Sequence, residues 1–241
     1  MNTFSKLNLA IENKGSTSKI IFSRDKKFDN KIIKEFCVFK DYNDIIKHFY
    51  TDEPRHYYEL FLEDAMCNYF IDLDIKDKEG IKNPEQRLND IIYTVKEGLT
   101  EYFYAQIEKE GNLVIEEIVL KSPATESKVS YHIIFRLQFE NNSVYFKDIS
   151  ICKNFFEFMT INKSNNLKSL GIDQIYSKNR SFRILNSSKI EYPNNKLKLI
   201  KPLDNPLMSL GSYCPENKDN IVLVKTLTIK KKAKKVKEPI I

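Results

Sequence analysis

The chain lacks several residue types that mark common ligand sites. Its 241 residues include no tryptophan, only six glycines and only four cysteines. The glycines form neither GxGxxG nor GxxxxGKS/T, so the sequence contains no Rossmann or P-loop nucleotide motif. The cysteines include no CxxC pair, and a zinc site built from them would need an unusual fold-back of the chain. Their spacing favours buried thiols in a reducing compartment: Cys37, Cys67, Cys152 and Cys214.

Long apolar runs are also missing. No segment approaches the roughly 18 apolar residues that cross a bilayer. The opening MNTFSKLNLAIENKG has no apolar stretch followed by a small-residue cleavage site. We therefore expect an intracellular protein with no membrane partner. The 41% hydrophobic and 12% aromatic content is enough for a core, which excludes disorder across the whole chain.

Positive charge is concentrated at one end of the chain. The net charge is +6, and residues 230–237 (KKKAKKVK) contain six of the 39 basic side chains. Without residues 230–241, 33 basic and 32 acidic side chains remain, so nucleic-acid affinity in the body requires a local patch. We expect a core of two sub-lobes at 1–229 and a disordered basic tail at 230–241. The tail is either a solvated linker, or a phosphate contact or nuclear-import signal.

Helical and alternating spacing predict a mixture of helices and strands. Helices are expected at 41–50, 84–109 and 147–161, and strands at 34–39, 56–62, 67–75, 113–121, 128–139, 180–185 and near 196–200. Residues 1–30 are polar and mixed, with one apolar cluster at 20–22. The elements do not alternate as regular βαβ units, so we expect an α+β fold.

Asp72 and Asp74 lie two residues apart in the apolar segment CNYFIDLDI (67–75). On a strand, residues i and i+2 share a face, so the two carboxylates stand side by side. Their repulsion raises a pKa unless a cation lies between them, and Mg²⁺ and Mn²⁺ prefer oxygen ligands of this type. The pair indicates a metal site. The alternative is an exposed polar strand end before a turn at 76–80.

A second polar stripe follows the strand expected at 128–139. Lys128, Ser130 and His132 share one face there and offer an ammonium, a hydroxyl and an imidazole. Donors in a row suit phosphate oxygens. The alternative is a solvated strand face.

A third cluster follows Gly171. Asp173 is a candidate third carboxylate, and Arg180 and Arg183 stand out in a chain that otherwise nearly always uses lysine. Arginine provides a planar fork for two-point phosphate contact, which lysine does not. The alternative is a surface ion pair between Arg180 and Asp173.

Taken together, these segments resemble the motifs of the archaeo-eukaryotic primase superfamily, and its PrimPol and herpesvirus-primase branch in particular. The motifs are FIDLD, SYH and IDQIYSKNRSFRILNSSK, of which the third is the most specific. The similarity extends over 56–74 and 128–137 and covers about residues 20–200. It implies a primase catalytic core, in which mixed sheets form an RRM-like subdomain and an N-terminal α/β subdomain on either side of a cleft.

The resemblance also implies a role for each matching acid. Asp72, Asp74 and Asp173 match the carboxylates that bind two Mg²⁺ or Mn²⁺ ions. Eukaryotic enzymes have glutamate as the second acid, whereas viral and archaeal relatives also use aspartate. Aspartate at position 74 is therefore compatible with an active enzyme.

The remaining matches concern nucleotide and template. His132 matches the histidine that contacts the incoming triphosphate, with Ser130 and Lys128 beside it. Tyr58 matches a tyrosine implicated in sugar discrimination, and Arg24 an N-terminal arginine near the template. Basic residues around the triphosphate and template are matched by Arg180, Arg183 and Lys189.

The expected function is that of a DNA primase-polymerase, a template-dependent nucleotidyltransferase. It would extend or initiate primers on single-stranded DNA with dNTPs or rNTPs, beside a helicase or single-strand-binding protein. The expected location is the nucleus, a mitochondrion or a viral replication site. No Cys/His cluster after residue 200 matches the zinc module of PrimPol, which favours extension over initiation.

Two other functions compete with this one. A metal-dependent nuclease would explain the paired acids, but not the donor stripe or the arginines. A non-catalytic primase-like subunit that binds nucleic acid would be indicated by loss of an acid or of the histidine, and none is lost.

Overall fold

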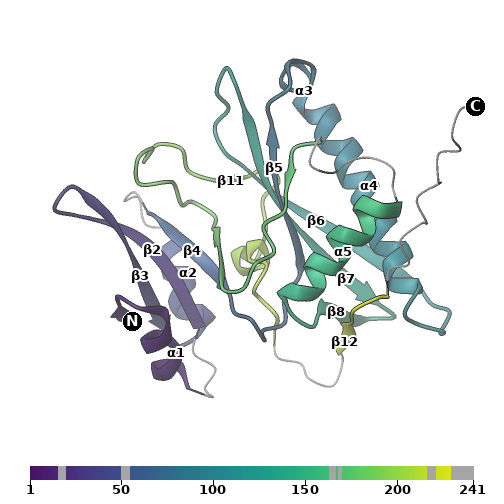
Figure 1. The fold of residues 1–241 in the computed structure, drawn as a ribbon, viewed down its shortest axis with the longest axis horizontal. Helices are drawn as coiled ribbons and strands as arrows, with labels where there is room; N and C mark the ends of the chain where they lie inside the picture. Colours follow the sequence, from purple (N-terminus) through teal and green to yellow (C-terminus); the bar gives the residue numbers. More distant parts are fainter. Residues whose placement is uncertain (16–19, 50–54, 163–166, 168–169, 216–220, 229–241) are drawn as a thin grey trace, which may run out of the picture.

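The structure is a computed structural model of the chain (Figure 1). It describes residues 1–15, 20–49, 55–162, 167, 170–215 and 221–228. The expected basic tail at 230–241 lies outside these residues, and so does Tyr50 at the end of the first expected helix. The described residues form an α+β fold with two sheets.

The first sheet is built around a long hairpin. Strands β2 (Ile20–Phe28) and β3 (Lys31–Phe39) pair along their whole length. The two residues between them, Asp29 and Asn30, have φ of 45° and 62°, as a tight two-residue hairpin turn requires. The sheet order is β1-β3-β2-β4-β10, completed by β1 (Asn2–Phe4), β4 (Tyr57–Phe61) and β10 (Arg180–Arg183). Helix α1 (Leu7–Lys14) packs against the hairpin, and α2 (Tyr42–Phe49) follows β3.

The second sheet has the order β11-β6-β7-β5-β9, with β8 and β12 joined beside β7. Its pairs are antiparallel, apart from β8 and β12, which run parallel. The strands are β5 (Tyr69–Ile75), β6 (Leu113–Lys121), β7 (Val129–Phe139), β8 (Asn142–Phe146), β9 (Ile172–Asp173), β11 (Lys198–Leu199) and β12 (Ile221–Val224). Helices α4 (Pro84–Tyr104) and α5 (Ile149–Asn162) lie side by side over this sheet (Figure 1).

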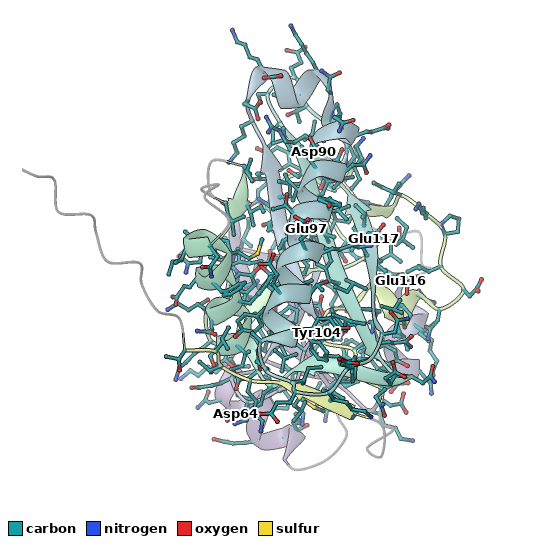
Figure 2. The ribbon with its side chains drawn as sticks, turned by 90° about the vertical axis from the view of Figure 1, so that its right-hand side faces the viewer. Asp64, Asp90, Glu97, Tyr104, Glu116 and Glu117 are labelled. Carbon is teal, nitrogen blue, oxygen red and sulfur yellow. The ribbon has the colours of Figure 1, made fainter. Side chains whose placement is uncertain are left out.

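Helix α4 packs on the second sheet through an apolar side. Its buried side repeats at helical spacing: Leu88, Ile91, Val95, Leu99 and Phe103. Asp90, Glu97 and Tyr104 lie on its outward side, and Glu116 and Glu117 lie beside it on β6 (Figure 2). The short helix α3 (Lys78–Lys82) precedes it, where the sequence indicated only a turn.

Several element boundaries differ from the expectation. The long helix ends at Tyr104 rather than at residue 109, because the chain folds back there and Tyr104 donates a hydrogen bond to the Gly111 carbonyl at 2.7 Å. The polar and mixed N-terminal residues contain three elements that were not predicted, β1, α1 and β2, and the apolar cluster at 20–22 lies in β2. Strand β8 and strand β12 were not predicted. Strand β6 begins and ends where expected.

One aromatic-rich core holds the second sheet to its helices. The ring of Tyr69 lies 4.6 Å from that of Phe155 and 5.6 Å from that of Tyr176, measured between centroids. Cys67 and Cys152 are buried here with their sulfurs 3.6 Å apart, and Cys37 is buried as well. These three agree with the expected core thiols, whereas Cys214 is only partly buried.

The 206–213 segment, which begins with the 3₁₀ helix η1 (Pro206–Ser209), is bound to both sheets. Glu59 of β4 is buried and accepts hydrogen bonds from Gly211 N and Ser212 N at 3.1 and 2.7 Å. Arg136 of β7 is buried too and donates to two carbonyls of the segment at 2.9 and 3.0 Å. Burial outweighs the hydrogen bonds and raises the pKa of Glu59 to about 7. The segment therefore ties the two sheets together through buried polar groups.

Replacing Arg136 with methionine is expected to lower the free energy of unfolding by about 3 kcal/mol. Buried carbonyls of the 206–213 segment lose their donors, and buried Glu59 loses a nearby positive charge. Urea denaturation measures the change. Arg87→Met is the matched control, because Arg87 forms a surface ion pair with Asp77 at 3.3 Å, worth less than about 1 kcal/mol. Equal losses in the two variants would contradict this role of Arg136.

Candidate functional site

The register of β5 with its two neighbours brings the candidate residues into one row. Asp72 is paired with His132 on β7 and with Asp173 on β9. Asp74, two residues along β5, is paired with Ser130 of β7. Because directly paired residues in an antiparallel sheet share a face, all five side chains belong to the same face of the sheet.

Strand β9 approaches β5 through a glycine. Gly171 has a φ of 88°, which favours glycine, and its carbonyl accepts a hydrogen bond from Asp74 N at 2.8 Å. A side chain at this position would collide with the Asp74 carbonyl. The glycine thus allows Asp173 to stand opposite Asp72.

A cavity of about 540 Å³ lies where this row meets the first sheet. Residues of both sheets line it, since β4 and β10 belong to the first sheet and β5, β7 and β9 to the second. Ten of the eleven predicted site residues take part: Tyr58, Asp72, Asp74, Lys128, Ser130, His132, Asp173, Arg180, Arg183 and Lys189. Four segments far apart in the sequence are brought together here.

Arg24 is the predicted residue that does not line the cavity. Its Nε donates to Glu35 Oε2 at 2.8 Å, and its Nη1 donates to Tyr57 Oη at 3.3 Å. Both partners belong to the first sheet. The structure thus places Arg24 in an ion pair on that sheet.

Asp74 is neutralised within the protein. Lys128 Nζ donates to its carboxylate at 2.8 Å and Ser130 Oγ at 2.7 Å, and Lys76 Nζ lies 3.4 Å away. Burial alone would raise the pKa of Asp74, but the hydrogen bonds from Lys128 and Ser130 outweigh it and hold the pKa below its usual value. Asp74 is therefore ionised at neutral pH.

The negative charge of Asp72, two residues away, is poorly balanced by nearby positive charges. Burial raises its pKa to about 6, and the charge of Asp74 adds to the effect. Lys128 and Arg183 act in the opposite direction without cancelling it. The nearest basic nitrogen is Nε2 of His132, 3.6 Å from Asp72 Oδ1. A carboxylate of this kind favours a cation arriving in the cavity.

His132 is held in one tautomer. Its Nδ1 lies 3.1 Å from the Arg183 carbonyl, which only accepts, so Nδ1 carries the proton. Its ring stacks on Phe182 with centroids 4.0 Å apart. Burial, followed by the charge of Arg183, lowers the pKa of His132 to about 3. In this state Nε2 presents an acceptor to the cavity, whereas the sequence predicted an imidazole that donates.

Strand β10, which carries Arg180 and Arg183, contacts both sheets. Arg183 pairs in register with Tyr58, and its Nη2 donates to Ser122 Oγ at 2.9 Å. Arg180 and Asp173 both line the cavity, and no ion pair between them is present in the described structure. The alternative of a surface ion pair between Arg180 and Asp173 is therefore wrong. Tyr58 donates to Asp25 Oδ2 at 2.8 Å.

Seven residues of the lining were not predicted from the sequence. Phe182, between the two arginines, was not singled out although its ring supports His132. The others are Ser122, Pro123, Thr125, Tyr192 and Asn195 from two loops, and Ser181 from β10 completes the lining. Loop residues have no periodicity that would mark them, so no pattern in the sequence pointed to the five loop positions.

The donor chemistry of the cavity fits a divalent metal. It offers three carboxylates from two adjacent strands, and one of them, Asp72, lacks a matched counter-charge. Oxygen ligands of this kind suit Mg²⁺ and Mn²⁺. Across the residues that the structure describes, no three His, Cys, Asp or Glu side chains surround a common point as metal ligands. The ammonium of Lys128 lies on Asp74 in this arrangement.

Two comparisons with known proteins were without a match. No protein-family model matches the sequence, and a search of curated proteins finds no match. Within the described ranges, no helix is both long enough and apolar enough to cross a bilayer.

Asp72 is expected to make the folded chain less stable as the pH rises. Its pKa of about 6 exceeds the ordinary 3.8, so the folded state binds more protons than the unfolded state between these values. Stability therefore falls as the pH rises through about 4 to 6. Asp72→Asn removes the charge and is expected to gain on the order of 1–3 kcal/mol over the unaltered chain at pH 8.

Urea titrations at pH 8 and pH 3.5 measure this difference, which is expected to vanish at the lower pH. Asp90→Asn is the matched control, since Asp90 is exposed on the outward side of α4 (Figure 2). A gain for Asp72→Asn that is the same at both pH values would show that the charge of Asp72 is not its cause.

Proposed function

We propose that this chain is a template-dependent nucleotidyltransferase, a DNA primase-polymerase that extends primers on single-stranded DNA. The observation that carries the proposal is the cavity, which three carboxylates line together with arginine and lysine side chains. The order of these residues along the sequence also resembles that of the primase motifs. The second sheet with α4 and α5 would be the RRM-like subdomain, and the first sheet with α1 and α2 the N-terminal α/β subdomain.

The acids would hold the metal. Asp72, Asp74 and Asp173 are the residues to bind Mg²⁺ or Mn²⁺, which supply activation of an attacking hydroxyl and stabilisation of a leaving pyrophosphate. Asp72 and Asp173 are direct register partners, so the sheet itself sets their separation. The ligands are thus positioned by backbone pairing rather than by a loop.

The basic residues would bind the triphosphate. Arg183 is held by Ser122, and its backbone carbonyl in turn holds His132, so the two side chains are oriented before a ligand arrives. Arginine forks and lysine ammonium groups stabilise the charge that develops on transferred phosphoryl oxygens. Arg180 and Lys189 line the same cavity and add to this charge.

Primer extension tests the proposal. The chain is incubated with a labelled primer on a single-stranded template, dNTPs and Mn²⁺. Lengthening of the primer supports the polymerase. Shortening would support a metal-dependent nuclease, and a mobility shift without any change in length would support a non-catalytic binding subunit.

Asp72→Asn and Asp173→Asn are each expected to reduce nucleotide incorporation by more than about 100-fold, because each removes a charged metal ligand. The rate of single-nucleotide extension at saturating template measures this loss. Asp90→Asn, outside the cavity, is expected to retain full activity. Near-normal extension by either cavity variant would refute the metal assignment.

Lys128→Met is expected to bind Mn²⁺ about fivefold more tightly without nucleotide, because the lysine competes for Asp74 at a cost of about 1 kcal/mol. Electron paramagnetic resonance of free Mn²⁺ measures the affinity. Lys121→Met is the matched control, since Lys121 lies over the ring of Tyr131 on the opposite face of the sheet. Unchanged or weaker Mn²⁺ binding by Lys128→Met would show that the Lys128–Asp74 pair does not oppose metal binding.

A further inference from the structure

The loop from Asn186 to Leu197 forms one side of the cavity and is firmly anchored at its base. Asn186 N donates to the Leu197 carbonyl at 2.8 Å, and Leu197 N donates to the Ser187 carbonyl at 3.0 Å. Ser188 N donates to the carbonyl of Arg55, just before β4, at 2.7 Å. Leu197 and both serines are fully buried. The loop therefore presents its tip in a defined position.

Tyr192 lies at this tip. Its backbone N donates to the Lys189 carbonyl at 3.0 Å, and its carbonyl accepts from Asn195 N at 2.9 Å. These bonds place Tyr192 beside Lys189, and all three residues line the cavity. The side chain of Tyr192 remains 61% exposed. An exposed tyrosine is ordinary by itself, but this one is held at the wall of a charged cavity.

The ring of Tyr192 is the available aromatic face of this lining. Phe182 is buried and stacked on His132. The ring of Tyr58 is covered by Lys34, whose Nζ lies 4.3 Å from the centroid. Among the described residues, no other aromatic ring contacts Tyr192. A planar ligand group can therefore stack on it without displacing a protein side chain.

The residues that line the cavity form a charged part and a neutral part. Its charged residues come mainly from strands β5, β9 and β10, with Lys128 just before β7 and Lys189 in the 186–197 loop. Its neutral residues come mainly from two loops and include Pro123, Thr125, Tyr192 and Asn195. The complementary ligand is a polyanion with a flat, uncharged ring attached to it. A nucleoside triphosphate has both parts.

We propose that Tyr192 is the stacking platform for the base of the nucleoside triphosphate, with the side-chain amide of Asn195 available to the edge of that base. This inference rests on the proposed function for the triphosphate part of the ligand. Stacking on an aromatic side chain tolerates every base, since each has a π-face. It stabilises binding by an amount that corresponds to at least about fivefold in affinity.

Isothermal titration calorimetry of the full chain with two probes tests the inference. The probes are ATP and inorganic tripolyphosphate, each with Mn²⁺ and without template. Tyr192→Ala is expected to weaken ATP binding about tenfold and to leave tripolyphosphate binding unchanged. Tyr192→Phe is expected to retain the ATP affinity, because it keeps the ring. Tyr93→Ala is the matched control, since Tyr93 is 65% exposed on α4.

Several results would overturn the inference. If Tyr192→Ala weakened the binding of ATP and of tripolyphosphate equally, the role of Tyr192 would be to maintain the shape of the loop. Unchanged ATP affinity, or loss of affinity only for a single-stranded oligo-dT, would mean that the ring does not contact the nucleotide base. ATP binding by a chain that extends no primer, with the expected Tyr192 pattern, would refute the proposed function but support this inference. Absence of any ATP binding by the unaltered chain would overturn it.

Discussion

The pairing of β5 with β7 and β9 determines where every acid of the cavity lies, because the side chains of a strand alternate between faces. On the face away from the cavity, Ile71, Leu73 and Ile75 are completely or almost completely buried. Each contributes about 1.5–3 kcal/mol by leaving water. A shift of the register by one residue would expose this row and bury Asp72 and Asp74 instead. The hydrophobic core therefore holds two like charges side by side.

The join between the two sheets is the second constraint. Strand β10 pairs with β4 of the first sheet, yet its side chains reach the second: Phe182 stacks on His132, and Arg183 bonds to Ser122. The buried groups Glu59 and Arg136 bind the 206–213 segment from opposite sheets. The arginines thus face the acids only because the sheets are fixed relative to each other.

Two carboxylates on one strand have opposite electrostatic environments. Asp74 receives hydrogen bonds from Lys128 and Ser130, and its pKa is held down. Asp72 has no matched donor, and burial raises its pKa to about 6. Such a separation between neighbouring acids is typical of sites that bind or move charge. It also gives the two residues different expected responses to pH, to metal and to substitution.

The sequence by itself determined the local part of this picture. Alternation in 67–75 and 128–139 was sufficient to put Asp72 with Asp74, and Ser130 with His132, on single faces, because that periodicity is a local property of a strand. Helical spacing from Pro84 located the start of α4 for the same reason. Only the tertiary structure decided the rest, which depends on contacts between distant segments. It paired Asp72 with Asp173, placed Lys128 on Asp74, fixed the tautomer of His132 through the Arg183 carbonyl, and brought Tyr192 to the cavity wall. None of these follows from residue type or spacing, because each is set by how two sheets and their loops pack.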